Sequence, residues 1–587
     1  MEATRVFDLL QHQLATFPKP DSLAAKVNGT WKKWSTQDFL DDANAIGKGL
    51  IAVGVQPGDR VAIVSPNRPE WVLSDYACQH IGAISVPLYP TITAEDYAFI
   101  FADSGAKVVL VSAREQYDKA VEAIATMAEK PALYSYDSIE GALNLEQLKA
   151  GGSNVPSQEL IDRQAAVGPH DLFTIIYTSG TTGKPKGVML THNNLIKNIE
   201  GSGTCMPVDE KATALSFLPL CHVYERMVLG IYVCFGVSVY FAESMETIGD
   251  NLKEVKPELF TTVPRLLEKV YDKIVAKGYE LTGVKKALFF WALRLGHEYE
   301  IGFDKGPWYN FQLGIARKLI FSKWKEALGG NVICIVSGAA ALQPRLARVF
   351  RAAGIAVMEG YGLTETSPVM SVNRLEETGS RVGTVGLLIP NVEVKIAEDG
   401  EILTKGPCLF KGYWHRQDLT DEVIDAEGWF HTGDVGEMSA DGFLKITDRK
   451  KEIFKTSGGK YIAPQMLENK LKESVVIEQA MVVGDGQKFP SALVVPAFAA
   501  LRDWCRIKGI AYSTDSAMLE VKEVKDKFDA EIGKLNNQLA QYEKVKKYVL
   551  LPALFTIENN EITPTLKLKR KVILERYKRE VESMYAS

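Results

Sequence analysis

Short apolar runs alternate with segments of helical periodicity over the first two thirds of the chain. Arg60–Ser65 and Ile84–Leu88 each predict a strand, and Pro69–Ile81 between them predicts a helix. Further strands are predicted at Lys107–Val111, Leu172–Tyr177, Ala214–Leu218, Val237–Phe241, Glu258–Thr262, Val332–Val336 and Ile355–Met358. This alternation predicts parallel, doubly wound sheets with helices on both faces. There are more strands than one sheet usually holds, so we expect two packed sheets.

The pattern changes after Arg381. Val392–Ile396 and Ile402–Thr404 flank one turn, and a second turn precedes Phe443–Ile446. Such closely spaced hairpins predict a small β-barrel at about residues 380–447.

We therefore expect an α/β fold with a large N-terminal domain, residues 1–447, that contains two packed doubly wound sheets and the β-barrel. The run Asp-Arg-Lys-Lys that starts at Asp448 is too charged for a core and indicates a boundary. Residues 448–587 predict a small α+β C-terminal domain.

The longest apolar run is Met227–Ala242, which is shorter than the ~20 residues that a membrane span needs. Gly236 interrupts it, and strand-forming residues follow. We interpret it as a buried helix followed by a buried strand.

Composition is that of an ordinary globular protein, with 46% hydrophobic and 24% charged residues. The net charge of −5 gives no reason to expect nucleic acid as a partner. Seven cysteines without a Cys-x-x-Cys pair indicate free thiols in a reducing compartment, and residues Met1–Pro20 lack the apolar core of a signal peptide. We expect a cytoplasmic protein.

The most informative run is Tyr177-Thr-Ser-Gly-Thr-Thr-Gly-Lys-Pro-Lys-Gly187. Glycines allow backbone N–H groups to approach an anion, hydroxyls donate to phosphate oxygens and lysines neutralise them. With a strand at Leu172–Tyr177 before it and a helix predicted at Val188–Ile199 after it, the run predicts a phosphate-binding loop at a helix N-terminus. It is not a common P-loop, because Pro185 follows Lys184.

Two further runs carry candidate chemistry, and one histidine needs an interpretation. In Glu359-Gly-Tyr-Gly-Leu-Thr-Glu-Thr-Ser367, Tyr361 can lie flat against a base and Glu365 suits a magnesium ion held partly by phosphates. In Gly428-Trp-Phe-His-Thr-Gly-Asp434, the carboxylate can clasp a ribose diol. His222, taken alone, is typical of a core histidine and not of a metal ligand.

Together with Asp448-Arg-Lys-Lys-Glu-Ile453 and Leu566-Lys-Leu-Lys-Arg-Lys571, these runs, in this order, resemble the adenylate-forming (AMP-binding) enzymes. The resemblance covers about residues 21–571. It implies that the C-terminal domain is a mobile lid that turns about a hinge at Lys451. It also implies that Lys567 reaches the site during adenylation, although the usual Ser-Gly-Lys reads Thr565-Leu566-Lys567 here and Lys569 is a rival.

The same resemblance assigns the remaining roles. Thr181 and Glu365 are expected to hold magnesium, and the catalytic candidates are Lys567, Glu365, His222 and Thr181. The expected nucleotide-binding residues are Thr178, Ser179, Gly180, Thr181, Thr182, Gly183, Lys184, Lys186, Gly338, Ala339, Glu359, Gly360, Tyr361, Gly362, Thr364, Asp434 and Arg449.

Within the superfamily, the chain is most similar to long-chain fatty-acid–CoA ligases. The implied reaction activates a fatty acid with ATP and Mg²⁺, releases pyrophosphate and transfers the acyl group to coenzyme A. A fatty-acyl-AMP ligase that loads an acyl carrier protein is the alternative. A nucleotide-binding or membrane-associated protein without turnover is a third class.

The segment from Arg265 to Gly330 is rich in Leu, Phe and Trp, with helical stripes in Leu266–Lys277 and Leu288–Leu295. We interpret most of these residues as additional core. The sharper hypothesis is that part of the segment lines a fatty-acyl tunnel or makes a peripheral contact with a bilayer. Leu267 stands near the position of a tryptophan gate found in some long-chain relatives.

Overall fold

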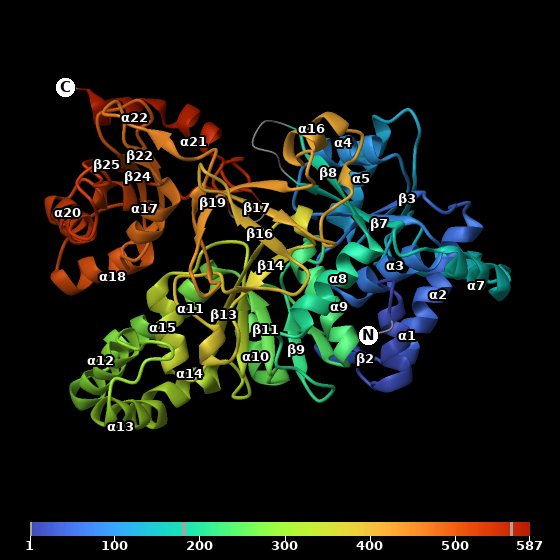
Figure 1. Cartoon of the computed structure of the whole chain (residues 1–587), viewed down its shortest axis with the longest axis horizontal. Helices are drawn as coiled ribbons and strands as arrows, with labels where there is room; N and C mark the ends of the chain where they lie inside the picture. The colour runs from blue at the N-terminus through green and yellow to red at the C-terminus, as the bar shows by residue number, and fades with distance from the viewer. Residues whose placement is uncertain (1–2, 179–183, 564–566, 587) are drawn as a thin grey trace.

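The computed structural model describes residues 3–178, 184–563 and 567–586 (Figure 1). Two large sheets dominate this part of the chain. The first has seven described strands in the order β18-β8-β7-β4-β3-β5-β6. Their bounds are β3 (Arg60–Val64), β4 (Ile84–Leu88), β5 (Ala106–Val111), β6 (Ala132–Ser135), β7 (Leu172–Thr178), β8 (Lys186–Thr191) and β18 (Gly412–Tyr413).

The second sheet has nine strands within the described ranges, in the order β15-β14-β13-β12-β11-β9-β10-β1-β2, and its central pairs from β10 to β13 are parallel. Its strands are β1 (Leu23–Val27), β2 (Thr30–Trp34), β9 (Thr213–Ser216), β10 (Ser238–Phe241), β11 (Leu259–Thr262), β12 (Cys334–Ser337), β13 (Ala356–Gly362), β14 (Val369–Val372) and β15 (Leu387–Leu388).

Helices connect these strands and cover the sheets. They are α1 (Asp8–Thr16), α2 (Thr36–Ala52), α3 (Pro69–His80), α4 (Ala94–Ser104), α5 (Arg114–Ala125), α6 (Leu145–Gly151), α7 (Ser157–Ala166), α8 (His192–Gly203), α9 (Val223–Phe235), α10 (Ile248–Val255), α11 (Pro264–Glu280), α12 (Gly283–His297), α13 (Pro307–Ala316), α14 (Ser322–Ala327), α15 (Pro344–Ala352) and α16 (Gln417–Val423). Along β3, Val61 and Ile63 join the main core, whereas Ala62 and Val64 pack in the separate core beneath α4 and α5. Successive residues of a strand face opposite sides, so this sheet is buried on both faces, as predicted.

A buried ion pair joins the two sheets. Arg226 of α9 donates from Nε to Asp75 Oδ2 of α3 at 3.0 Å, and its other nitrogens bond Asp75 Oδ1, Thr174 and Ser85. The run Met227–Ala242 forms most of α9 and then β10, as expected from its pattern. Among the described residues, no helix is both long and apolar enough to cross a bilayer.

The helix predicted over Val188–Ile199 is wrong for its first four residues. Lys186–Thr191 is strand β8, which pairs antiparallel with β7, and α8 begins at His192 with Thr191 and Asn194 in a capping box. The sequence Val-Met-Leu-Thr suits a pleated, buried strand, and the pairing with β7 decides the outcome. The glycine-rich run therefore connects two strands of a hairpin and does not lead into a helix N-terminus.

Residues after Arg381 form a four-stranded antiparallel sheet, counted in the described part of the chain, in the order β16-β17-β19-β20. Its strands are β16 (Glu393–Ile396), β17 (Glu401–Lys405), β19 (Phe430–Met438) and β20 (Leu444–Arg449). Met370, Ile402 and Leu444 form its small core against β14. These strands match the predicted hairpins.

The C-terminal region has cores of its own around a three-stranded sheet, β23-β24-β25, and lies apart from the large sheets at the upper left of Figure 1. Its elements are β21 (Phe454–Lys455), β22 (Tyr461–Ile462), α17 (Pro464–Leu471), β23 (Ile477–Val483), β24 (Ser491–Pro496), α18 (Phe498–Lys508), α19 (Asp515–Met518), α20 (Lys522–Asn536), β25 (Lys547–Leu550), α21 (Arg570–Arg576) and α22 (Lys578–Tyr585). The predicted α/β fold class, with a large N-terminal and a small C-terminal domain, is confirmed. Strand β20 runs two residues past the predicted boundary at 447/448, which stays a prediction.

The buried pair generates a stability prediction. Asp75→Ala leaves the Arg226 charge buried without its partner, so we expect the free energy of unfolding to fall by about 3–5 kcal/mol. Chemical denaturation followed by tryptophan fluorescence measures the change. Arg381→Ala is the control, because its pair with Asp441 is exposed and should contribute about 0–1 kcal/mol. Equal losses in both variants would contradict a special role for the buried pair.

Candidate nucleotide site

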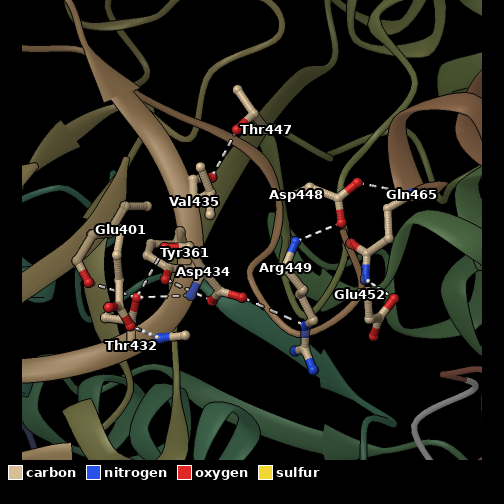
Figure 2. A network of polar contacts seen from close by, with 12 residues as sticks. Tyr361, Glu401, Thr432, Asp434, Val435, Thr447, Asp448, Arg449, Glu452 and Gln465 are labelled. Carbon is tan, nitrogen blue, oxygen red and sulfur yellow. Dashed lines mark hydrogen bonds and ion pairs between the residues drawn. The ribbon is translucent and has the colours of Figure 1, made fainter. Parts of the chain in front are cut away.

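The pairing of β19 with β20 creates the centre of the site (Figure 2). Asp434 lies directly opposite Arg449 in this ladder, and Arg449 Nε is 3.5 Å from Asp434 Oδ1. Tyr361, from the end of β13 in the nine-stranded sheet, donates its hydroxyl hydrogen to Asp434 Oδ2 at 2.7 Å. Residues far apart in the sequence thus meet at one carboxylate.

Burial controls the protonation of this group. The Asp434 carboxylate is buried, which raises its pKa, while the Arg449 charge and the Tyr361 hydrogen bond act in the opposite direction. Burial and the neighbouring Asp434 charge raise the pKa of Tyr361 well above its usual range, so Tyr361 stays a hydrogen-bond donor. A carboxylate oriented in this way keeps lone pairs for the hydroxyls of a ribose.

A glycine allows the turn after Tyr361. A Cβ added to Gly362 would lie 1.7 Å from the Pro368 carbonyl oxygen, so no larger residue fits there. The turn continues into a 3₁₀ helix, η2 (Thr364–Thr366), which presents Glu365. Tyr413 of β18 donates to Glu365 Oε1 at 2.8 Å, and this bond ties η2 to the edge of the seven-stranded sheet.

Only the two ends of the glycine-rich run belong to the described residues. Ser179, Gly180, Thr181, Thr182 and Gly183 lie outside the described residues, and their predicted contacts with phosphate and magnesium stay predictions. Thr178 and Lys186 pair with each other where the two strands meet the loop.

The lysines that follow the loop differ in their surroundings. Lys186 Nζ lies 4.2 Å from the centre of the Tyr413 ring. Burial lowers the pKa of Lys186, and the Glu365 charge counteracts this effect. Lys184 Nζ lies 5.1 Å from the centre of the Phe99 ring of α4.

The loop after β12 holds the residues expected at the adenine. Ala339 adopts φ +68°, a left-handed conformation that costs a non-glycine residue on the order of 1 kcal/mol. A Cβ on Gly338 would lie 3.1 Å from the Tyr224 ring. Burial raises the pKa of Glu359 to about 8, and its Oε2 accepts a bond from the Leu342 N–H at 3.3 Å.

Lys567 comes to this site from the C-terminal region. Its side chain keeps accessible surface, but displacement of water by the surrounding protein lowers its pKa to about 8. The charge of Arg449 also lowers this pKa, whereas the charges of Asp434 and Glu365 raise it. His222 caps the N-terminus of α9 with Nδ1, and burial together with the Lys567 charge lowers its pKa to about 4.

The rival lysine faces elsewhere. Lys569 Nζ donates to Asn560 Oδ1, and its backbone N–H donates to the Glu561 carbonyl at 2.8 Å. The geometry therefore favours Lys567 as the cation of the site.

Contacts across the expected hinge were not foreseen from the sequence. Asp448, before Lys451, accepts a bond from the Gln465 backbone N–H at the start of α17 at 3.1 Å (Figure 2). Burial raises the pKa of Asp448 to about 6. Arg265 of α11 forms an ion pair with Glu478 of β23. Tyr413 was also missed. Its position in a two-residue strand carries no local signal for a contact with Glu365.

Comparison with known proteins identifies the family. The AMP-binding enzyme model matches residues 10–414, and the model of the AMP-binding enzyme C-terminal domain matches residues 451–587. The chain belongs to the AMP-binding enzyme family. The membership expected from its motifs is confirmed.

Relatives of this AMP-binding enzyme include long-chain fatty-acid–CoA ligases. The protein named long-chain-fatty-acid–CoA ligase FadD15 from Mycobacterium tuberculosis is 35% identical over 567 residues, which are 95% of this chain and 93% of that protein. Long-chain-fatty-acid–CoA ligase 6 from Mus musculus is 33% identical over 588 residues, 94% of this chain and 82% of that protein.

Solved structures have the same fold. The adenylation domain of a carboxylate reductase from Mycobacterium chelonae superposes with a TM-score of 0.80 at 22% identity, over 100% of this chain and 92% of that one.

The position of Lys567 generates the first prediction for this site. Removing its charge with Lys567→Ala should slow adenylate formation by about 100-fold or more, because the negative carboxylate and α-phosphate then approach without this cation. Pyrophosphate exchange measures this step, and thioester formation from preformed acyl-adenylate should persist. Lys569→Ala is the matched control. Should Lys569→Ala, and not Lys567→Ala, show this pattern, the assignment is wrong.

The lowered pKa of Lys567 predicts an alkaline limit. The ammonium is the useful form, so at pH 7 most of the enzyme is active, and kcat/KM for adenylation should fall as the pH passes about 8. Lys567→Arg stays protonated over the whole range, so its profile should lack this decline even if its rate is lower. Persistence of the decline in Lys567→Arg would assign it to another group.

Proposed function

We propose that this AMP-binding enzyme is a long-chain fatty-acid–CoA ligase. It converts a fatty acid, ATP and CoA into acyl-CoA, AMP and pyrophosphate. One observation carries the proposal. Tyr361 and Arg449 hold the buried Asp434 carboxylate in the place proposed for the ribose, and Tyr413 holds Glu365 close by in the chain after Tyr361, as an adenylation site requires. Relatives named long-chain fatty-acid–CoA ligases or long chain acyl-CoA synthetases, at 32–35% identity over nearly the whole chain, support the choice of substrate.

In the first half-reaction, a carboxylate oxygen of the fatty acid attacks the α-phosphorus of ATP. A new P–O bond forms, the bond to the β-phosphate oxygen breaks, and pyrophosphate leaves with the electron pair. Asp434 holds the ribose, and the glycine-rich hairpin with Lys186 holds the phosphates. Lys567 lies where attacking and attacked groups, both negative, must meet, and its charge reduces their repulsion.

Magnesium fits the carboxylate that the structure provides. Mg²⁺ in nucleotide sites is usually bound by one or two protein carboxylates and by substrate phosphates, and Glu365 is held at the mouth of the hairpin by Tyr413. Glu365 would hold the ion together with the hydroxyl of Thr181. When bound, the ion neutralises charge on the phosphates.

In the second half-reaction, the sulfur of CoA attacks the acyl carbon of the adenylate. The thiol proton is released, the C–S bond forms, and AMP leaves. We propose that the C-terminal region turns about Lys451 to expose the adenylate to CoA, which removes Lys567 from the centre. This turn breaks the Asp448–Gln465 bond, because those residues lie on opposite sides of the hinge.

The acyl chain is proposed to lie against α11. This helix starts directly after β11, and its Leu267 and Tyr271 are buried in the main core. We place the enzyme in the cytoplasm, on the grounds of its composition and of a sequence without a Cys-x-x-Cys pair.

The substrate proposal predicts a chain-length profile. Each methylene buried against α11 contributes about 0.8 kcal/mol, so catalytic efficiency should rise from short acids to a maximum in the long-chain range. AMP release over a series of saturated acids measures this profile, with free CoA and with acyl carrier protein as separate acceptors. The proposal expects turnover with CoA. A preference for acetate or aryl acids would overturn the substrate, and turnover only with carrier protein would overturn the acceptor.

A further inference from the structure

Helices α12 and α13 leave large apolar side chains uncovered. Trp308 and Phe311 on α13 are 71% and 60% exposed, and their rings stack with centroids 5.8 Å apart. Leu319, further along the same helical segment, is 52% exposed. Most soluble surfaces carry such residues singly, so this grouping needs a physical reason.

The group lies on one side of a helix. Positions 308, 311 and 319 fall within one stripe on a helical period, whereas Leu313 and Ala316 face the core and are buried. The helix runs on from α13 through a π-helical turn, η1 (Arg317–Phe321), into α14. The inner face of this helix packs against the protein core, so the outer stripe is not required for folding of the core.

The neighbouring helix extends this surface. Trp291 Nε1 donates to Gln312 at 3.2 Å, and the Tyr309 hydroxyl donates to the Leu295 carbonyl at 2.7 Å, so α12 and α13 run antiparallel. Val284 at the start of α12, which is 75% exposed, therefore lies toward the Leu319 end. Both helices lie at an outer edge of the molecule, at the lower left of Figure 1.

The stretch of chain that carries these side chains has a net positive charge. Residues 284–323 contain seven Lys or Arg and three Asp or Glu, a net of +4 (7 − 3), although the whole chain carries −5. Lys285 and Lys318 are exposed and form no ion pair with any described residue. An apolar stripe flanked by unpaired lysines matches the chemistry of a bilayer surface, where acyl chains lie beneath anionic headgroups.

We propose that the outer face of α12 and α13 docks on an anionic lipid bilayer. Trp308, Phe311 and Leu319 enter the boundary between headgroups and acyl chains, and Lys285 and Lys318 contact the headgroups. The inference deepens the proposed function and rests on it for the nature of the substrate, because a long-chain acid resides in such a bilayer. Helix α11 precedes α12 in the chain, with two residues between them.

Vesicle flotation with the full chain, in the absence of substrates, tests the proposal. The probes are phosphatidylcholine vesicles with and without phosphatidylserine. We expect the wild-type chain to float with the anionic vesicles at low salt and less at high salt. Trp308→Ser combined with Phe311→Ser should reduce the bound fraction about tenfold or more, and Lys285→Glu combined with Lys318→Glu should remove the preference for phosphatidylserine.

Matched controls come from α18. Ile507 is 71% exposed and is followed by the exposed Lys508, so Ile507→Ser and Lys508→Glu make the same changes on another surface and should float like wild type. Pyrophosphate exchange with a fatty acid supplied on albumin shows that each variant is folded. It also separates failure of docking from failure of the proposed ligase function.

Three results would overturn the proposal. The first is that the wild-type chain does not float. The second is that the Trp308 and Phe311 variant floats as the wild type does. The third is that the α18 controls lose as much vesicle binding as the α13 variant does. Sedimentation velocity can give a fourth such result. The wild-type chain would associate with itself as its concentration rises, would not float with vesicles, and would lose the self-association only in the Trp308 and Phe311 variant. That outcome would assign the face to a second copy of this chain.

Discussion

The antiparallel register between β19 and β20 is the constraint on which the site depends. It sets Asp434 opposite Arg449, and two residues later the chain reaches Lys451. A shift by one residue would turn Asp434 toward the opposite face of the sheet and separate it from Tyr361. One hairpin therefore fixes the positions of Asp434, which is proposed to bind the ribose, of its partner Arg449, and of the expected hinge residue Lys451.

Positive side chains gather around this hairpin, where the phosphates of ATP are proposed to bind. Burial lowers the pKa of Lys186 and that of Lys567, and nearby carboxylates, with Glu365 acting on both lysines, counteract this effect. The phosphates of ATP carry the negative charge that would restore full protonation. The binding of ATP and the protonation of Lys186 and Lys567 are thus coupled, and this coupling needs no movement of the backbone.

The sequence predicted most of the parallel strands of both sheets, because buried parallel strands are continuous apolar runs, but it missed β1, β2, β6, β14, β15 and β18. The same reasoning failed at Val188–Thr191, where a β-branched apolar run also fits a helix and only its pairing with β7 decides. Site residues in compact motifs, such as Tyr361 and Asp434, could be predicted through resemblance. The contacts of Tyr413, Asp448 and Arg265 could not, since each depends on a partner at least 17 residues away whose position is set by the tertiary fold.

The ion pair of Arg265 with Glu478 gives α11 a second role. Arg265 lies two residues before Leu267 on the helix that we place beside the acyl chain, and it also bonds Glu268 on that helix at 2.9 Å. Any displacement of α11 by a bound tail is therefore transmitted directly to β23 in the C-terminal region. One ion pair therefore connects the helix proposed to lie beside the acyl chain with the region of the chain that carries Lys567.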